Sequence, residues 1–529
     1  MEKLMLLGDE AVAQGALDAG LSGCYAYPGT PSTEITEYVQ ASIMARQNNV
    51  RSEWASNEKT AMEAALGMSY AGKRALVCMK HVGLNVAADP FLNSAITGAN
   101  GGLVYAIADD PSMHSSQNEQ DTRYYGKFAM IPVLEPANQQ EAYDMAYYGF
   151  ELSEKFRVPV VLRLTTRLAH SRAGIRRKEM QKQNELKLPG NPLQFILLPN
   201  MARKSYNHLL ELQKDFEKEA KEGSFNALID GPNKEFGIIA CGLAYNYLIE
   251  NFIDHKSPYP VLKICQYPVP VDMIRELIKK VNNKVLVIEE GFPLVEEMLR
   301  GYLDDGLEVN GRMDGYLPRA GELNPDLVAN ALGLPGKKIN EVPDFISNRP
   351  PALCKGCSHI DTFLALNDAI AEFGEGRVFS DIGCYTLGAY PPYNAIYTCV
   401  DMGASLTMAK GAADAGLVPA VTVIGDSTFT HSGITGLLDA VNEKSPITVI
   451  ISDNSTTAMT GGQKSAATGR LAEICKGIGV EPNHIRTIIP LKKHHQENVS
   501  IIREELKYDG VSVVISEREC IQTAVRKRK

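Results

Sequence analysis

The sequence of 529 residues lacks the marks of several protein classes. It has no basic excess, because its formal net charge is −9, and this argues against nucleic acid as the main partner. It has no apolar run close to the ~20 residues that cross a bilayer, so no membrane span is expected. Its N-terminus has no charged segment followed by a small-residue cleavage site, so no signal peptide is expected. These absences predict a soluble cytoplasmic protein.

What the sequence does contain is an alternation of short β-branched runs and amphipathic segments. Ala420–Ile424 and Ile447–Ser452 are typical of buried strands, whereas Glu58–Ala71 and Met402–Ala415 are typical of helices. Such alternation indicates parallel sheets covered by helices. It predicts the α/β fold class.

Two interruptions of this pattern suggest domain boundaries. Residues 186–229 are charged and mostly helical, which predicts a linker helix, and Pro335–Pro351 suggests a second connector. We therefore expect three α/β domains with parallel sheets, at residues 1–185, 230–335 and 350–529.

Two predicted strands end in side chains that suit a divalent cation. The first strand runs into Gly425-Asp426-Ser427, and the second ends at Asp453-Asn454. Open α/β sheets bind ligands at the carboxyl ends of their strands, and Mg²⁺ prefers a few oxygen ligands completed by phosphate and water. A magnesium ion that holds a diphosphate is therefore one interpretation, and a plain turn is the other.

Four of the ten cysteines have a spacing that suits a metal site: Cys354, Cys357, Cys384 and Cys520. Cysteines of a cytoplasmic protein are normally reduced, and soft thiolates suit iron–sulfur or zinc. The absence of a second Cys-x-x-Cys argues against a zinc ribbon, while a thioredoxin-like pair and scattered structural cysteines stay open as alternatives. The other six cysteines, which lie in apolar patterns, are predicted to be packed core thiols: Cys24, Cys78, Cys241, Cys265, Cys399 and Cys475.

Two predicted helix starts near the N-terminus carry candidate functional side chains. Thr30 lies in Tyr27–Ser32, between a strand and a helix, where it could bind a substrate carboxylate or simply cap the helix. Glu58 falls in the first turn of another helix, where a carboxylate also stabilises the helix dipole. Capping and helix stabilisation are the plainer interpretations of these two residues.

A polar run from Asp109 to Arg123 leaves the end of a predicted strand, which is the usual place for a substrate loop. The guanidinium of Arg123 could grip a substrate carboxylate with two hydrogen bonds. Gly98, Gly101 and Gly102 precede that strand, so they do not form a dinucleotide-binding fingerprint, which must follow one.

Taken together, segments spread over essentially the whole chain resemble the 2-oxoacid:ferredoxin oxidoreductases, most closely the large, thiamine-binding subunit of the indolepyruvate type. Each segment is weak evidence alone, but their number and order are specific. The magnesium–diphosphate motif of thiamine enzymes begins Gly-Asp-Gly and closes Asn-Asn, and this sequence departs from it at Ser427 and Asp453. The resembling segments are Tyr27–Ser32, Asn57–Lys59, Met79–Asn85, Cys354-x-x-Cys357, Asp381–Gly388, Gly425–Phe429 and Thr457–Gly461.

The resemblance implies a pyrimidine-binding domain at 1–185 and a diphosphate-binding domain at 350–529, both of thiamine diphosphate type. They would flank a transketolase C-terminal-like domain at 230–335. Glu58 matches the glutamate that hydrogen-bonds the cofactor's aminopyrimidine and so promotes loss of the thiazolium C2 proton. Arg123 and Thr30 are expected to contact the substrate carboxylate.

The resemblance also implies a ligand set for the cofactor's metal. Asp426 and Asn454 match the side-chain ligands of Mg²⁺, and the carbonyl of Thr456 is expected as a third ligand. The other residues expected to bind the cofactor are Gly383, Gly425 and Ser427.

Cys354, Cys357, Cys384 and Cys520 match the ligands of one [4Fe–4S] cluster near the cofactor. Subunits of this type normally continue into a ferredoxin-like tail with two more clusters, whereas this sequence ends nine residues after Cys520. The further electron relay is therefore expected in another protein, with ferredoxin or a similar carrier as acceptor. A small β-type subunit and a dimer of heterodimers are expected as well.

The implied reaction is oxidative decarboxylation of an aryl 2-oxoacid with coenzyme A to an acyl-CoA and CO₂. One alternative is a non-oxidative thiamine lyase that releases the aldehyde, with merely structural cysteines. Another is a non-catalytic scaffold subunit. The four-cysteine set favours the oxidoreductase over the lyase, and Glu58 with Asp426 and Asn454 argues against the scaffold.

Overall fold

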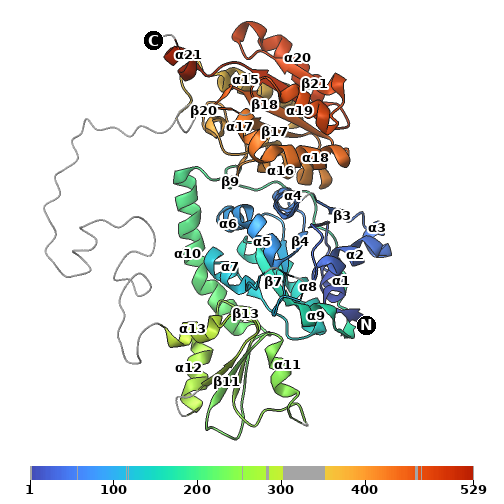
Figure 1. Ribbon diagram of the computed structural model, residues 1–529, viewed down its shortest axis with the longest axis vertical. Helices are drawn as coiled ribbons and strands as arrows, with labels where there is room; N and C mark the ends of the chain where they lie inside the picture. The colour runs from blue at the N-terminus through green and yellow to red at the C-terminus, as the bar shows by residue number, and fades with distance from the viewer. Residues whose placement is uncertain are drawn as a thin grey trace, which may run out of the picture. The chain divides into compact units, whose positions relative to one another are not determined.

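The computed structural model describes residues 3–301 and 352–527, apart from residues 56, 115, 117, 253, 282–284, 459–462 and 466. Figure 1 shows helices packed around three larger sheets whose strands are mostly parallel, which confirms the predicted α/β class. One compact unit comprises Met1–Phe292 together with Leu353–Lys529, and α13 (Leu294–Arg300) lies outside it. No helix in the described ranges is long and apolar enough to cross a membrane.

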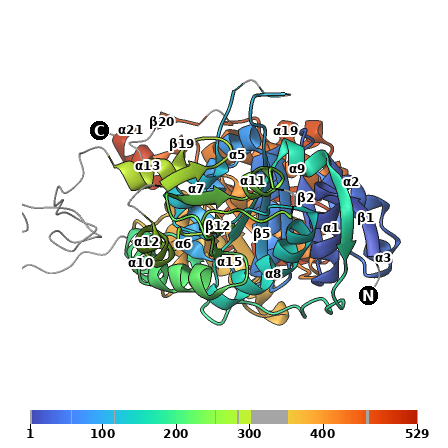
Figure 2. The same cartoon turned by 90° about the horizontal axis from the view of Figure 1, so that it is seen from below.

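The N-terminal sheet has seven strands in the order β13-β6-β7-β5-β4-β2-β3, and only the β13–β6 pair is antiparallel. Successive side chains of a strand point to opposite faces. On β5, Val104, Ala106 and Ala108 belong to the core cluster that includes residues of α1 and α8, while Tyr105 contacts Phe91 of α6. Figure 2 shows α1 and α6 on opposite sides of β5. The sheet is thus buried on both faces, as its apolar runs predict. The bounds are β2 Gly23–Ala26, β3 Arg51–Trp54, β4 Ala75–Lys80, β5 Leu103–Asp109, β6 Val133–Leu134, β7 Val160–Thr165, β13 Gln266–Tyr267, α1 Gly8–Asp18, α6 Ala88–Thr97 and α8 Gln139–Phe156.

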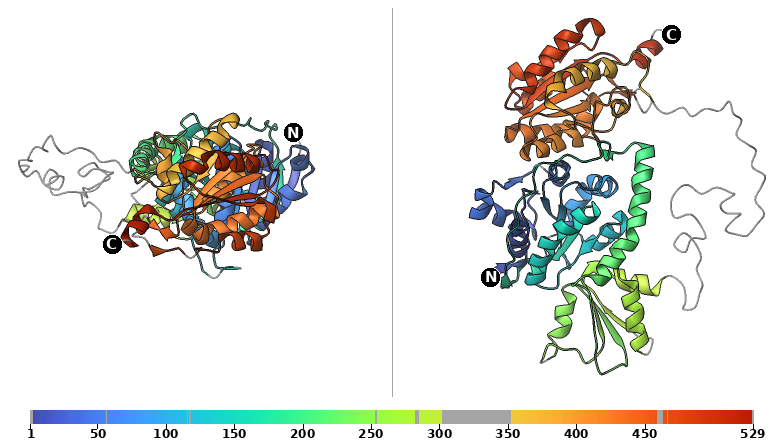
Figure 3. Two further views of the ribbon diagram at one scale, coloured as in Figure 1. Left: turned by 90° about the horizontal axis from the view of Figure 1, so that it is seen from above. Right: turned by 180° about the vertical axis from the view of Figure 1, so that it is seen from behind.

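The C-terminal sheet has five parallel strands in the order β15-β17-β18-β22-β21. Helix α15 packs on α20, and α16 packs on α18 and on β17; Figure 3 shows this sheet among its helices. All its strands end at one edge, so the residues that follow β15, β17 and β18 are neighbours in space. The bounds are β15 Val378–Ser380, β17 Ala420–Gly425, β18 Ile447–Asp453, β21 Ile485–Ile488, β22 Ser512–Glu517, α15 Ser358–Ile370, α16 Ala404–Asp414, α18 Ile434–Asn442, α19 Leu471–Ile478 and α20 His495–Leu506.

The middle sheet has the order β10-β12-β11-β14, and its edge strand β10 is antiparallel to β12. The long helix α10 (Pro199–Glu222) lies within the segment that the sequence predicts as a helical linker. The predicted connector at Pro335–Pro351 and the end of the predicted middle domain lie outside the described residues, so the domain boundaries stay predictions. The bounds are β10 Ala227–Ile229, β11 Gly237–Cys241, β12 Val261–Ile264, β14 Val285–Ile288, α11 Ala244–Ile249 and α12 Val271–Lys280.

Several shorter elements complete the described part of the chain. Strand β1 pairs with β8, β9 with β16, and β19 with β20. Their bounds, with those of the remaining helices used below, are β1 Lys3–Leu7, β8 Arg172–Arg176, β9 Phe195–Ile196, β16 Thr398–Cys399, β19 Thr456–Thr457, β20 Gln463–Lys464, α2 Thr33–Ala41, α3 Ile43–Gln47, α4 Glu58–Tyr70, α5 His81–Val86, α7 Thr122–Ala129, α9 Thr166–His170, η2 Cys384–Ala389, α17 Asp426–Thr428 and α21 Ile521–Lys527.

Helix α4, which packs on the N-terminal sheet, and α16, which packs on the C-terminal sheet, approach each other very closely. A Cβ at Gly67 would lie 2.2 Å from the carbonyl oxygen of Met408, and one at Gly411 would lie 1.9 Å from that of Ala64. Only glycine allows two helix backbones to approach so closely. Helix α4, which begins at Glu58, is thereby held against α16.

Candidate functional site

The carboxyl ends of β17 and β18 place acidic side chains next to each other. Gly425 pairs with Ser452, so Asp426 and Asp453 stand at adjacent strand ends. Asp426 is only 2% exposed, and its Oδ2 atom has no hydrogen-bond partner among the described residues. Burial raises the pKa of Asp426 to about 6, with a smaller contribution from the charge of Asp453. A buried carboxylate oxygen without a donor is costly, and a cation would stabilise it, so this site fits Mg²⁺.

The turn after β18 holds the other two predicted magnesium ligands. The Oδ1 atom of Asn454 accepts a hydrogen bond from the amide of Thr456 at 3.1 Å, and both residues are buried. Ser455 between them has a φ of 60°, which bends the chain sharply. Since β19 begins at Thr456 and contacts α17, which begins at Asp426, the structure brings all three predicted ligands together.

Gly383 and Gly425, the two glycines expected beside the cofactor, both lie against the ring of Tyr385. A Cβ at Gly383 or at Gly425 would lie 2.2 or 2.6 Å from a ring carbon of Tyr385, so larger residues would displace that ring. The hydroxyl of Tyr385 donates a hydrogen bond to Asp381, which directly follows β15. Ser427, the third residue of this predicted set, follows Asp426 in α17 and is partly buried.

Asp381 is a candidate functional residue to which the sequence analysis assigns no role. It is fully buried, and burial raises its pKa to about 7. Its second oxygen accepts a hydrogen bond from Ser405 at 2.7 Å. The signal that could have found it is its position, because it is a carboxylate at a strand end of this sheet, as Asp426 and Asp453 are.

Glu58 is the first residue of α4, and the side chain of Asn57 caps this helix by accepting a hydrogen bond from the amide of Thr60 at 2.7 Å. The Glu58 carboxylate lies against α5, where a Cβ at Gly83 would be 2.6 Å from its Oε1 atom. Capping is thus supplied by Asn57, and the Glu58 carboxylate is not needed for it.

Lys59, the residue after Glu58, links α4 to the segment that precedes α16. The Nζ atom of Lys59 lies 2.7 Å from Oδ1 of Asp401, which is buried, and it also contacts Glu63 on its own helix. The hydroxyl of Thr407 donates a hydrogen bond to Glu63 at 2.6 Å. Lys59 and Asp401 are far apart in the sequence, so no local pattern could have predicted this ion pair.

The four cysteines predicted as cluster ligands come from three segments of the C-terminal module. Cys354 and Cys357 lie in the turn before α15, Cys384 begins η2, and Cys520 directly precedes α21. None of the ten cysteines forms a disulfide. The predicted core thiols Cys24, Cys78, Cys241, Cys265, Cys399 and Cys475 are all buried.

The four thiols are close enough for the charge on one to shift the pKa of another. Burial first, and then the charges of Cys354, Cys384 and Cys520, raise the pKa of Cys357 to about 11. Burial and the charges of Cys520 and Cys354 also raise the pKa of Cys384. Thiolates that repel one another without a cation are stabilised by iron or another soft metal, so the set fits a metal centre.

Hydrogen bonds tie these cysteines to the strand-end site. The amide of Cys520 donates to the carbonyl of Asn454 at 3.1 Å, next to the predicted magnesium ligands. The guanidinium of Arg518 donates to the carbonyl of Gly356 at 2.8 Å and to Asp361 at 2.9 Å. The turn that carries Cys354 and Cys357 is thereby held beside the segment that carries Cys520.

Arg123 occupies a different environment from the one predicted. It is 1% exposed, and its guanidinium donates to Asp121, Glu289 and the carbonyl of Phe292 at 2.6 to 2.9 Å. Further bonds to Tyr267 and the carbonyl of Glu290 occupy its remaining donors. No donor is left for a substrate carboxylate, so this geometry does not support the predicted substrate contact.

Thr30 lies on an exposed segment between β2 and α2. The hydroxyl of Ser32 donates to the carbonyl of Gly29 at 2.7 Å, and the amide of Gly29 donates to Thr33, so this turn is held by its neighbours. The substrate contact of Thr30 stays a prediction.

Replacing Arg123 by Met is expected to lower the free energy of unfolding by about 3–5 kcal/mol, because it removes the buried cation that pairs with Glu289 and leaves Asp121 with Arg163 at 3.5 Å. Urea denaturation measures the loss, and Lys127→Met, at an exposed position of α7, is the matched control. A raised KM for the oxoacid at unchanged stability would instead restore the predicted role of Arg123 in substrate binding.

Comparisons with known proteins indicate the family of this chain. A family model for "Pyruvate flavodoxin/ferredoxin oxidoreductase, thiamine diP-bdg" matches residues 14–202, and one for "Thiamine pyrophosphate enzyme, C-terminal TPP binding domain" matches residues 381–514. "Indolepyruvate oxidoreductase subunit IorA" of Archaeoglobus fulgidus is 40% identical, over 98% of this chain and 86% of its own length. The protein of the same name from Pyrococcus abyssi is 37% identical over the same shares.

The chain belongs to the indolepyruvate oxidoreductase subunit IorA family. This confirms the predicted resemblance to the 2-oxoacid oxidoreductases, and the two family models support thiamine diphosphate binding by this IorA-type chain. A solved thiamine diphosphate-dependent 4-hydroxybenzoylformate decarboxylase from Rhodococcus jostii matches with a TM-score of 0.50 at 13% identity. That match covers 97% of this chain and 99% of the other, and it shows likeness of fold alone.

Proposed function

We propose that this chain is the thiamine diphosphate- and [4Fe–4S]-bearing subunit of an enzyme that oxidatively decarboxylates an aryl 2-oxoacid. The oxoacid and coenzyme A would yield an acyl-CoA, CO₂, a proton and two electrons. The observation that carries the proposal is the position of the four cysteines, because Cys520 is hydrogen-bonded to Asn454 beside the strand-end carboxylates. The name of the relatives, indolepyruvate oxidoreductase, supports an aryl substrate.

Each part of the site then has a defined task. Thiamine diphosphate, when bound, supplies the nucleophile and the electron sink for decarboxylation. Asp426, Asn454 and the carbonyl of Thr456 hold its Mg²⁺. Glu58 hydrogen-bonds the aminopyrimidine and holds a proton there.

The remaining contacts would shape the cofactor site and pass on the electrons. Ser427 and the backbone of Gly383 and Gly425 would lie beside the diphosphate. Electrons would leave one at a time through the cluster on Cys354, Cys357, Cys384 and Cys520 to ferredoxin or a similar carrier. The relatives are named as subunits, which supports a partner chain; we propose a small β-type subunit in a dimer of heterodimers.

A non-oxidative 2-oxoacid decarboxylase is the second candidate, because the thiamine modules alone would suffice for it. The two are separated by supplying indolepyruvate, phenylpyruvate or 2-oxoglutarate with coenzyme A and methyl viologen under anaerobic conditions. An oxidoreductase reduces viologen and forms an acyl-CoA, with the aryl substrates preferred. Release of the aldehyde without viologen reduction would favour the lyase instead.

Replacing Glu58 by Gln is expected to slow deuterium exchange at the C2 position of bound thiamine at least ~100-fold, because an amide cannot serve as the acid–base group. NMR of acid-quenched cofactor measures the exchange. Cofactor affinity should change little, since Glu58 is not a metal ligand in this proposal. Glu211→Gln, on an exposed side chain of α10, is the control. Exchange at the wild-type rate would mean that Glu58 serves only the helix.

A further inference from the structure

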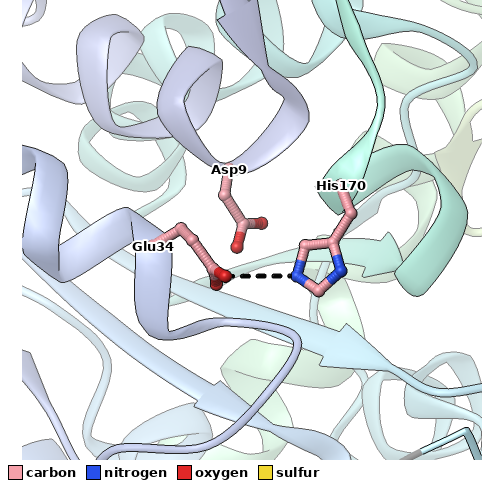
Figure 4. Close-up of side chains that lie close together, drawn as sticks. All are labelled: Asp9, Glu34 and His170. Carbon is pink, nitrogen blue, oxygen red and sulfur yellow. Dashed lines mark ion pairs between the residues drawn. The ribbon is translucent and has the colours of Figure 1, made fainter.

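Three side chains, from α1, α2 and α9 of the N-terminal part of the chain, converge where no function has been assigned to any of them. Asp9 lies in the first turn of α1, Glu34 in the first turn of α2, and His170 ends α9. One potential ligand atom from each lies within 4.8 Å of the others, and Nε2 of His170 is 3.4 Å from Oε1 of Glu34. Figure 4 shows the carboxylate of Asp9 pointing into the space between the other two.

Of these three side chains, Asp9 is the one whose burial is most costly. It is fully buried, yet neither of its carboxylate oxygens has a hydrogen-bond partner within the described ranges. A buried carboxylate of this kind is costly unless a cation or a donor satisfies it. Capping does not account for it, because Glu10 supplies the cap of α1 by accepting a hydrogen bond from the amide of Leu7 at 2.8 Å.

The backbone around the cluster is built for close approach. A Cβ at Gly8 would lie only 2.2 Å from the carbonyl oxygen of Leu168 in α9. The amide of Gly8 also donates a hydrogen bond to the carbonyl of Ser171 at 3.2 Å. Glycine at this position therefore lets the start of α1 lie directly against the end of α9, and this contact brings Asp9 next to His170.

We propose that Asp9, Glu34 and His170 form a binding site for one divalent cation of the zinc class. Two carboxylate oxygens and one imidazole nitrogen are ligands that Zn²⁺ takes at about 2.0–2.2 Å, and a water molecule completes its tetrahedron. Ligand atoms around such an ion are roughly 3.4 Å apart, which is the separation between Glu34 and His170. The ion's charge offsets the two carboxylates, and the partly exposed side chains of Glu34 and His170 leave a route for it from solvent.

A proton shared between Asp9 and Glu34 is the competing explanation. Burial first, and then the charge of Glu34, raise the pKa of Asp9 well above its ordinary value, and a protonated carboxyl could hydrogen-bond its neighbour. That explanation requires no metal and gives His170 no role. The two therefore differ in what happens when zinc is added and when His170 is changed.

The test uses the full chain purified anaerobically with its iron and saturated with magnesium and thiamine diphosphate, so that other metal sites are occupied. Zinc chloride is added against a chromophoric chelator, and bound zinc and the melting temperature are both measured. Glu34→Gln is compared with Glu37→Gln, an exposed residue of the same helix, and His170→Gln with His208→Gln, an exposed histidine of α10.

The wild-type chain and both controls should bind one more zinc than the Glu34 and His170 variants, with at least ~tenfold higher affinity, because each variant removes a ligand. Zinc should also raise the melting temperature of the wild type and the two controls, since it binds their folded state. It should not raise that of the Glu34 and His170 variants. Equal zinc binding by all five proteins would overturn the proposal. So would an Asp9→Asn variant that melts higher than wild type while its zinc binding is unchanged, because that result identifies a shared proton.

Discussion

Replacing Asp426 by Ala is expected to weaken the binding of magnesium thiamine diphosphate at least ~100-fold, because the metal would lose a direct ligand. Titration calorimetry measures this change. The substitution should not lower the melting temperature of the cofactor-free protein. Burial raises the pKa of Asp426 above its ordinary value, so the ionised carboxylate destabilises the fold near neutral pH.

Two further variants make this experiment decisive. Asp426→Asn keeps the shape of the side chain and should also weaken cofactor binding, since an amide lacks the charge. Asp509→Ala, at an exposed position before β22, should bind the cofactor like the wild type. Unchanged affinity in both Asp426 variants would show that the strand-end carboxylate is no part of the cofactor site.

Replacing Cys357 by Ser is expected to remove the iron, from about four atoms per chain to below about one, because a cubane cluster uses four thiolates. Oxoacid-dependent reduction of methyl viologen should then stop. Decarboxylation should continue and release the aldehyde, since it needs the thiamine site and Glu58 but no electron acceptor.

The matched control for this variant is Cys475→Ser, a buried thiol in α19 that lies outside the four-cysteine set. It should retain iron and viologen reduction. Circular dichroism of both variants guards against local unfolding, because a lost ligand can unfold the turn that carries it. A Cys357→Ser protein that is free of iron and still reduces viologen with an oxoacid would contradict the proposed electron route.

The strand-end residues could be predicted from the sequence because their positions follow from local rules. Two apolar runs that end in Asp426 and Asn454 must place these side chains at one edge if the strands are parallel neighbours, and the structure pairs them so. The burial of the six core thiols follows from their apolar surroundings in the same way. The α/β class follows from the alternation of the two patterns.

The environment of Arg123 could not be predicted from such local rules. Its polar surroundings in the sequence suggested a substrate loop, but residues 289–292, which come from another part of the chain, cover it and bind its guanidinium. The ion pair of Lys59 with Asp401 also depends on a tertiary contact, namely the packing of α4 on α16. The cluster of Asp9, Glu34 and His170 combines three helices, and none of the three residues lies in a recognisable motif.

The central claim is that electrons from the oxoacid pass from the thiamine site of this chain to a single iron–sulfur cluster. The most direct test is anaerobic EPR of the chain purified with its partner subunit, after addition of indolepyruvate and coenzyme A without any chemical reductant. We predict the signal of a reduced [4Fe–4S] cluster that appears only with substrate, in protein that holds about four irons and one thiamine diphosphate per chain. Thiamine-loaded protein that converts the oxoacid yet contains no iron and gives no signal would contradict the account.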